Sequence, residues 1–216
     1  FCDARGVFKI INMDLRQFKR LKMFVHAEDR RPPGSGFSPL DSTHLSVFMR
    51  IGSDFVNNYY EYELPLYPSQ VDRLPANRNS ESREYKEEVW RPENSFDFPL
   101  QLLTQIKQAR NEEGFTLEQE YEADDPENPR AKVKVIGNPN LGYVRGIMVG
   151  VRNVKLDQEP KCVELWLNEL RLNGFNEQFA FAGQARVDMK LADLGNISMA
   201  GSYTGIGWGA IEQRVV

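Results

Sequence analysis

Few residues in this chain have the type and spacing that catalysis or metal binding requires. The 216-residue sequence has two histidines, His26 and His44, and no cluster of histidine and cysteine at the spacing of a metal site. No serine, histidine and aspartate can be grouped as a nucleophilic triad from their places in the sequence. The sequence therefore predicts a protein that is not an enzyme and that carries no cofactor.

An acidic stretch is the one candidate for binding a cation. Asp124, Asp125 and Glu127 could offer oxygen ligands to calcium, but they lack the regular spacing of a calcium loop. A solvated acidic loop is the preferred interpretation. No metal ligands are therefore predicted.

Aromatic residues give a stronger functional signal. Six of them lie on or near a polar stretch over residues 67–94: Tyr59, Tyr60, Tyr62, Tyr67, Tyr85 and Trp90. Exposed aromatic rings beside polar groups can anchor a protein partner or stack on a sugar ring. The other interpretation is that these rings pack in the core or pin the stretch down. Both interpretations stay open, and the candidate partner-binding residues are Tyr59, Tyr67, Tyr85 and Trp90.

The two cysteines, Cys2 and Cys162, each lie in or beside a predicted strand. In an oxidising envelope compartment they could form a disulfide bridge, or they could stay as two separate buried thiols. Spacing in the sequence does not decide between these, because a bridge requires the two Cα atoms to approach closely.

The elements that must position these residues are mostly strands. Runs of bulky or alternating residues predict strands over 7–11, 21–27, 45–51, 58–64, 131–136, 143–152 and 162–172. One helix is predicted at about residues 98–111, with Asp97 as its cap, Pro99 in its first turn and Gly114 at its end. Prolines mark residues 67–94 as a long loop. Residues 1–174 are thus predicted to be mainly β, a jelly-roll-like β-sandwich with one helix.

The pattern changes in residues 175–216. Ala185, Val187, Met189 and Leu191 alternate with charged residues, and a second alternating run follows the turn at residues 193–196. This predicts an amphipathic β-hairpin over about 182–204. Each arm has about the 9–11 residues of a membrane-spanning strand, so the hairpin either begins a large outer-membrane β-barrel or covers a soluble core.

Several segments resemble one known family. Residues 166–175 and 185–195, together with 21–28, 60–66 and 150–153, are similar to segments of the SprA/Sov family. The resemblance implies a fragment of the outer-membrane translocon of type IX secretion, needed for protein export and gliding motility. It favours the barrel interpretation of the hairpin. It also implies an outer-membrane lipid-binding barrel protein, a plug protein and secreted cargo as partners.

Charge and chain ends complete the prediction. The net charge of −4 gives no reason to expect nucleic acid as a partner. No run reaches the roughly 20 apolar residues of a membrane helix. The chain begins with Phe1 and shows no leader peptide, so we expect it to be a piece of a longer protein.

The predicted function is a structural and interaction segment of the translocon, located at the cell outer membrane. Turns on the periplasmic side of such barrels are short, so a periplasmic turn at residues 193–196 would place the sandwich on the extracellular side. The alternative is a carbohydrate-binding jelly-roll module of a cell-surface protein.

Overall fold

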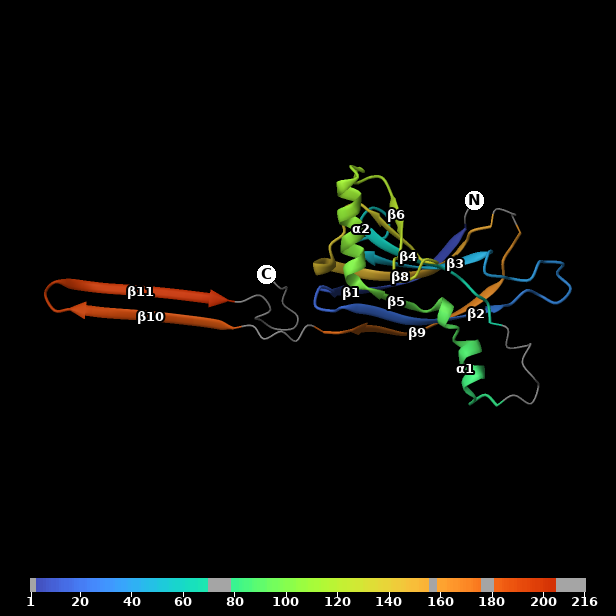
Figure 1. Cartoon of the computed structure of the whole chain (residues 1–216), viewed down its shortest axis with the longest axis horizontal. Helices are drawn as coiled ribbons and strands as arrows, with labels where there is room; N and C mark the ends of the chain where they lie inside the picture. The colour runs from blue at the N-terminus through green and yellow to red at the C-terminus, as the bar shows by residue number, and fades with distance from the viewer. Residues whose placement is uncertain (1–2, 70–78, 156–158, 176–180, 205–216) are drawn as a thin grey trace. The chain divides into compact units, whose positions relative to one another are not determined.

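The computed structural model describes residues 3–69, 79–155, 159–175 and 181–204. The chain divides into two compact units, Phe1–Phe175 and Asn176–Val216, which are described separately. The first unit contains two antiparallel sheets, and the second contains one antiparallel hairpin (Figure 1). This confirms the predicted mainly β class.

The larger sheet of the first unit has six strands in the order β1-β8-β3-β4-β7-β6. The strands are β1 (Ala4–Met13), β3 (Leu45–Gly52), β4 (Tyr59–Pro65), β6 (Tyr121–Asp124), β7 (Lys132–Ile136) and β8 (Val144–Asn153). All pairs in this sheet are antiparallel. In the centre of the sheet β3 and β4 form a hairpin, whereas β3 and β8 pair across about a hundred residues of sequence.

The smaller sheet has three strands in the order β5-β2-β9. They are β2 (Arg20–Asp29), β5 (Phe96–Pro99) and β9 (Val163–Asn173). The pairing of β2 with β9 shifts register between Lys22 and Phe24, where Glu169 of β9 adopts a positive φ of 56°. This bulge allows β9 to keep apolar side chains on one face on both sides of the irregularity.

The core lies between the two sheets. Period-2 alternation points Tyr60, Tyr62 and Leu64 of β4 inward, and all three are almost fully buried. The Tyr62 ring stacks on Phe98 of the smaller sheet at 4.2 Å between centroids. The predicted sandwich is therefore correct, because side chains from both sheets form one cluster.

The predicted helix is present as α2 (Leu100–Glu112), and it packs on β5, β6 and β7. It is followed by Gly114, which adopts a left-handed φ of 78°. The predicted Asp97 cap is wrong. Asp97 lies in β5 and pairs with Arg20 and Lys22 at 2.9 and 2.8 Å, so its carboxylate points across strands and not at the helix.

The stretch over 67–94 contains structure that its prolines do not predict. A short helix, α1 (Arg83–Val89), is capped by Ser82, whose side chain accepts the Tyr85 N–H, and η2 (Pro92–Asn94) follows it. The buried Asn94 side chain bonds both the N–H and the C=O of Tyr67, at 2.7 and 2.8 Å. The two ends of the stretch are therefore held together. Another short 3-10 turn, η3 (Leu141–Tyr143), precedes β8.

The second unit contains β10 (Ala182–Leu191) and β11 (Gly195–Thr204), each of 10 residues. Val187 pairs with Met199 and Met189 with Ile197, so these four side chains share one face. Asp188 pairs with Ser198 on the opposite face. The hairpin has one apolar face and one polar face, as its alternation predicts.

Candidate functional site

Four aromatic rings gather on the outer face of the smaller sheet. Trp90, which follows α1, lies 6.4 Å from Phe24 and 5.8 Å from His26 between ring centroids. Trp166 of β9 pairs with His26 in register, with their ring centroids 5.7 Å apart. We call Phe24, His26, Trp90 and Trp166 the aromatic group. Three segments far apart in the sequence meet there.

His26 fastens this group to the helix above it. Its side chain is almost fully buried, and Nδ1 lies 2.5 Å from the carbonyl oxygen of Val89 at the end of α1. Its Nε2 lies 3.2 Å from the Glu28 carboxylate. Both ring nitrogens therefore have partners, and the position of α1 over β2 is set partly by this contact.

The Trp166 indole is exposed and also held in place. Its Nε1 donates to Glu164 at 2.7 Å, and Arg30 donates to the same carboxylate at 2.6 Å. These two donors hold the pKa of Glu164 below its usual value. Trp166 is 54% exposed and the neighbouring Phe24 is 41% exposed. A large ring that is both exposed and oriented loses little entropy on binding, which suits a contact with a partner.

The structure does not bring the four predicted aromatic residues together. Trp90 belongs to the aromatic group, and Tyr85 lies half-buried one turn before it in α1. Tyr67 is half-buried at the start of the polar stretch, with the guanidinium of Arg130 5.7 Å from its ring centroid.

Tyr59 lies elsewhere, on the outer face of the larger sheet. It is buried, with the Arg50 guanidinium 4.2 Å over its ring. The Tyr59 ring is therefore covered by a residue of this chain, and its burial does not require a partner protein. Of the four predicted residues, only Trp90 belongs to the aromatic group.

Phe24 and Trp166 are absent from the sequence-based candidates. Each lies on the face of its strand that is opposite the apolar row. A large aromatic ring on the polar face of a predicted strand is the signal that could have identified them.

The cysteine prediction remains open. Cys162 immediately precedes β9 and is half-buried, and its carbonyl accepts the Arg30 N–H at 3.0 Å. Cys2 lies outside the described residues, so a bridge between the two stays a prediction.

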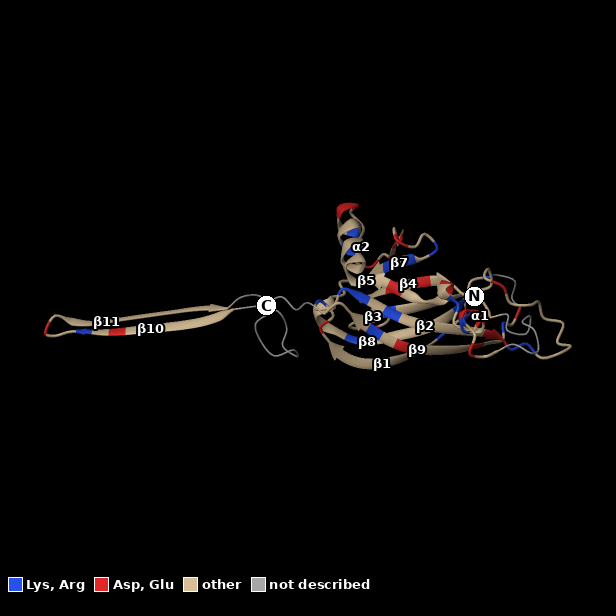
Figure 2. Ribbon diagram, turned by 60° about the horizontal axis from the view of Figure 1, so that its bottom comes forward, with Lys and Arg blue, Asp and Glu red and all other residues tan. Residues whose placement is uncertain are grey.

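A charged network covers the outer face of the larger sheet. Two buried carboxylates on β4 meet three cations from β3, β7 and β8: Glu61, Glu63, Arg50, Lys134 and Arg152. Figure 2 shows acidic positions along β4 and basic positions on the strands beside it. Glu61 has no exposed surface and lies 2.5 Å from Arg50 and 2.9 Å from Arg152. Its nearest Lys134 atom is at 3.6 Å. We call these five residues the buried ion network.

Glu63 is the second carboxylate of this network. It accepts a hydrogen bond from Ser46 at 2.5 Å, pairs with Lys134 at 2.9 Å, and also pairs with Arg152. Burial alone would raise its pKa, but the donors outweigh burial and bring the pKa from 4.5 to about 2. The network is fully partnered, so its arrangement is that of a structural element and leaves no carboxylate available for acid–base chemistry.

The depressed pKa of Glu63 predicts a loss of stability in acid. The Glu63 carboxylate takes up a proton near pH 4.5 in the unfolded chain and only near pH 2 in the folded chain. Its contribution to stability is therefore complete above pH 4.5 and is lost as the pH falls from 4.5 to about 2. Between pH 6 and pH 3 the group is expected to remove about 2 kcal/mol from the free energy of unfolding. Urea unfolding of Glu63→Gln should show this part of the pH dependence missing. An unchanged slope in the variant would contradict the assignment, and Glu122→Gln serves as the exposed control.

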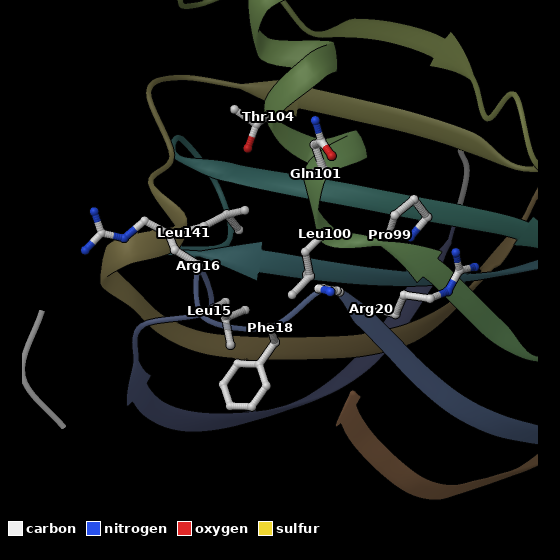
Figure 3. Close-up of a pocket in the computed structure, with 10 residues that line it drawn as sticks. Leu15, Arg16, Phe18, Arg20, Pro99, Leu100, Gln101, Thr104 and Leu141 are labelled. Carbon is white, nitrogen blue, oxygen red and sulfur yellow. The ribbon is translucent and has the colours of Figure 1, made fainter. Parts of the chain in front are cut away.

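A pocket of about 550 Å³ lies at one end of the sandwich, between the β1–β2 connection and the start of α2 (Figure 3). Its apolar wall includes Leu15, Phe18 and Leu141. Two cations at its rim are engaged, since Arg16 bonds Asp14 at 2.7 Å and Arg20 bonds Asp97 at 2.9 Å. The pocket is therefore mainly an apolar hollow, and the two arginines at its rim are paired with carboxylates and do not point together at a ligand position.

Metal-binding clusters and membrane-spanning helices are both absent from the described residues. Among them, no group of three or more histidine, cysteine, aspartate or glutamate side chains could hold a metal ion. Within the same part of the chain, no helix is both long and apolar enough to cross a membrane.

Comparison with known families supplies what the geometry does not. A family model described as a motility-related or secretion protein, SprA_N, matches residues 1–216. The chain belongs to the SprA_N family. Among proteins with curated descriptions, none matches the sequence. The match covers the sandwich, the aromatic group and the hairpin together, so all of these are features of a SprA_N chain.

Proposed function

We propose that this chain is a structural and interaction segment of an outer-membrane translocon of type IX secretion, contributing to protein export and gliding motility. The observation that carries the proposal is the match of the whole chain to a motility and secretion family. In the described residues, the carboxylates of the buried ion network have cationic partners, which favours a scaffold over a catalyst.

The hairpin supports the membrane part of this proposal. Both strands have 10 residues, about the length that spans a bilayer when tilted. Val187, Met189 and Met199 lie on one face, where lipid would contact them, while Asp188 lies on the face that would meet a wet lumen. In this proposal β10 and β11 begin the barrel, and the membrane is reached through them.

The aromatic group is the proposed contact surface for other translocon subunits. The expected partners are an outer-membrane lipid-binding barrel protein, a plug protein and secreted cargo. Trp166 and Phe24 supply exposed rings, and Glu28, Arg30 and Glu164 supply a charged rim. An aromatic centre with a charged rim is the usual composition of a protein interface.

The test replaces both exposed rings in the full-length protein. Phe24→Ala with Trp166→Ala is expected to reduce cargo secretion and subunit pull-down at least about tenfold, because central aromatic contacts typically contribute 2 kcal/mol or more. Val56→Ala is the matched control, since Val56 is 69% exposed in the turn before β4. Unchanged secretion and pull-down, at a normal level of the protein, would contradict the proposal.

A second candidate function is binding of carbohydrate. The exposed and oriented Trp166 indole is the observation that favours it, because such a ring can stack on a sugar. A glycan array on the purified chain distinguishes the two functions. Specific binding that Trp166→Ala abolishes, with secretion unchanged, would favour the carbohydrate module.

We further propose that the sandwich is extracellular. The turn between β10 and β11 is short, as periplasmic turns of outer-membrane barrels are. Ser38 has an exposed side chain in the long β2–β3 loop and is a suitable labelling position. With the native cysteines replaced by serine, Ser38→Cys is expected to react with an impermeant maleimide on intact cells. Reaction only after the outer membrane is permeabilised would show a periplasmic sandwich.

A further inference from the structure

The two sheets of the sandwich differ in width, and this leaves one side open. The smaller sheet ends at β9, and in the described part of the chain no strand pairs with β9 on the side away from β2. The larger sheet ends at β1. Val7 of β1 pairs with the buried Val149, so it shares the face that points between the sheets, yet it is 65% exposed. Nothing in the smaller sheet reaches far enough to cover it.

The same side of the sandwich shows an uncovered apolar row on β9. Leu165 and Leu167 pair with the core residues Ala27 and Val25, so both point inward. Leu165 is half-buried and Leu167 is 37% exposed. A hollow of about 480 Å³ opens at one end of this side, lined by Arg5, Val151 and Val163 among others. We call the space bounded by Arg5, Val7 and Lys9 of β1 and by Leu165 and Leu167 of β9 the open seam.

We propose that the open seam binds an extended segment of a partner protein, which adds a fourth strand to the smaller sheet along the free edge of β9. Neighbouring strands lie about 4.8 Å apart and packed sheets about 10 Å apart, so a strand beside β9 would lie over β1. Its inward side chains would cover Val7 and extend the row of Leu165 and Leu167. Addition of a strand to an exposed sheet edge is a common way to recognise a peptide.

The charges of β1 indicate the chemistry of the occupant. Between Ala4 and Met13 the strand carries Arg5 and Lys9 and no acidic residue. Arg5, Val7 and Lys9 occupy alternate positions on the inward face. The Arg5 side chain is 86% exposed, and its carboxylate neighbour Asp3 lies at 3.8 Å and is 71% exposed, so this surface pair is weak. A strand whose inward side chains are acidic, apolar and acidic at alternate positions would place opposite charges against Arg5 and Lys9.

Among the described strands, the two that border the open seam do not offer such a strand in a second copy. Its β1 would place Arg5 and Lys9 against the same cations, and like charges that face each other across an interface are unfavourable. Its β9 would offer the uncharged Leu165 and Leu167. Neither of these two strands fits the open seam, and we assign the occupant to a partner protein with an acidic and apolar strand. This inference stands on the sandwich geometry and not on the proposed translocon role.

The experiment uses the purified chain and labelled peptides of the length of β9. One peptide has Glu, Val and Glu at central alternate positions, with Thr between them, and the other has Lys in place of both Glu residues. Fluorescence anisotropy is expected to show about tenfold tighter binding of the Glu peptide. The double variant Arg5→Glu with Lys9→Glu should reverse this preference, a gain that an unfolded variant could not show.

Two controls test the strand geometry and the position. A Glu peptide methylated on alternate backbone nitrogens should bind about tenfold more weakly, because it cannot complete the ladder with β9. Arg83→Glu reverses a charge on α1 that is 88% exposed and should leave the preference unchanged. Equal binding of both peptides, no reversal in the double variant, or full binding of the methylated peptide would overturn the proposal. Self-association of the wild-type chain that the double variant abolishes would show a second copy as the occupant and would also overturn it.

Discussion

Replacing Glu61 with glutamine is expected to lower the free energy of unfolding by about 3–5 kcal/mol, the usual cost of removing one partner from a buried ion pair. Glu61 has no exposed surface and meets Arg50 and Arg152 directly. The amide keeps the shape of the side chain and removes its charge. Arg50 would then lose its carboxylate partner, and Lys134 and Arg152 would keep only Glu63 as the charged partner within the network.

Urea unfolding at neutral pH measures this effect. Glu122→Gln is the matched control, because Glu122 lies in the same cross-strand row beside Lys134 but is 42% exposed. Its loss should change the free energy of unfolding by less than about 1 kcal/mol. Similar effects of the two substitutions would show that burial of the ion network does not determine its contribution.

Introducing arginine at Met189 is the second substitution with a large expected effect. Met189 lies on the apolar face of the hairpin, opposite Ile197. Under the proposed function this face meets lipid, where arginine near the midplane costs about 2–4 kcal/mol. We expect the full-length Met189→Arg protein to be strongly depleted from the outer-membrane fraction, with a parallel fall in cargo secretion.

Ser198→Arg is the control for the hairpin. Ser198 lies on the opposite face and bonds Asp188, so an arginine there can pair with that carboxylate. The control protein is expected to reach the outer membrane at its normal level. Equal depletion of both variants would argue against a lipid-facing side, and normal levels of both would argue against membrane insertion of the hairpin.

Local pattern determined most of the strands and their faces. In β4 the alternation assigns Tyr60, Tyr62 and Leu64 to one side, and these residues form part of the core. The hairpin follows the same rule, since β10 and β11 occupy the residues that alternate. Period-2 alternation is strong evidence because a shift by one residue would expose every apolar side chain of a strand.

Residue alternation did not predict the short elements of the fold. Strands β5 and β6 have four residues each, and α1 has seven. A pattern of that length is too weak to predict an element, and α1 is held by tertiary contacts such as the bond from His26 to Val89. The mistaken Asp97 cap has a related cause, since its true partners lie on β2, 75 or more residues away in the sequence.

The sequence by itself therefore determined the mainly β class, the inward faces of strands such as β3 and β4 and the amphipathic hairpin, because these depend on neighbouring residues. Only the tertiary structure decided the sheet order, the burial of Glu61 and Glu63 and the meeting of Trp90 with Trp166. The sequence places both glutamates on a polar face, where exposure is the ordinary outcome. They are buried because Arg50, Lys134 and Arg152 converge on them from three strands, and that convergence depends on long-range pairing.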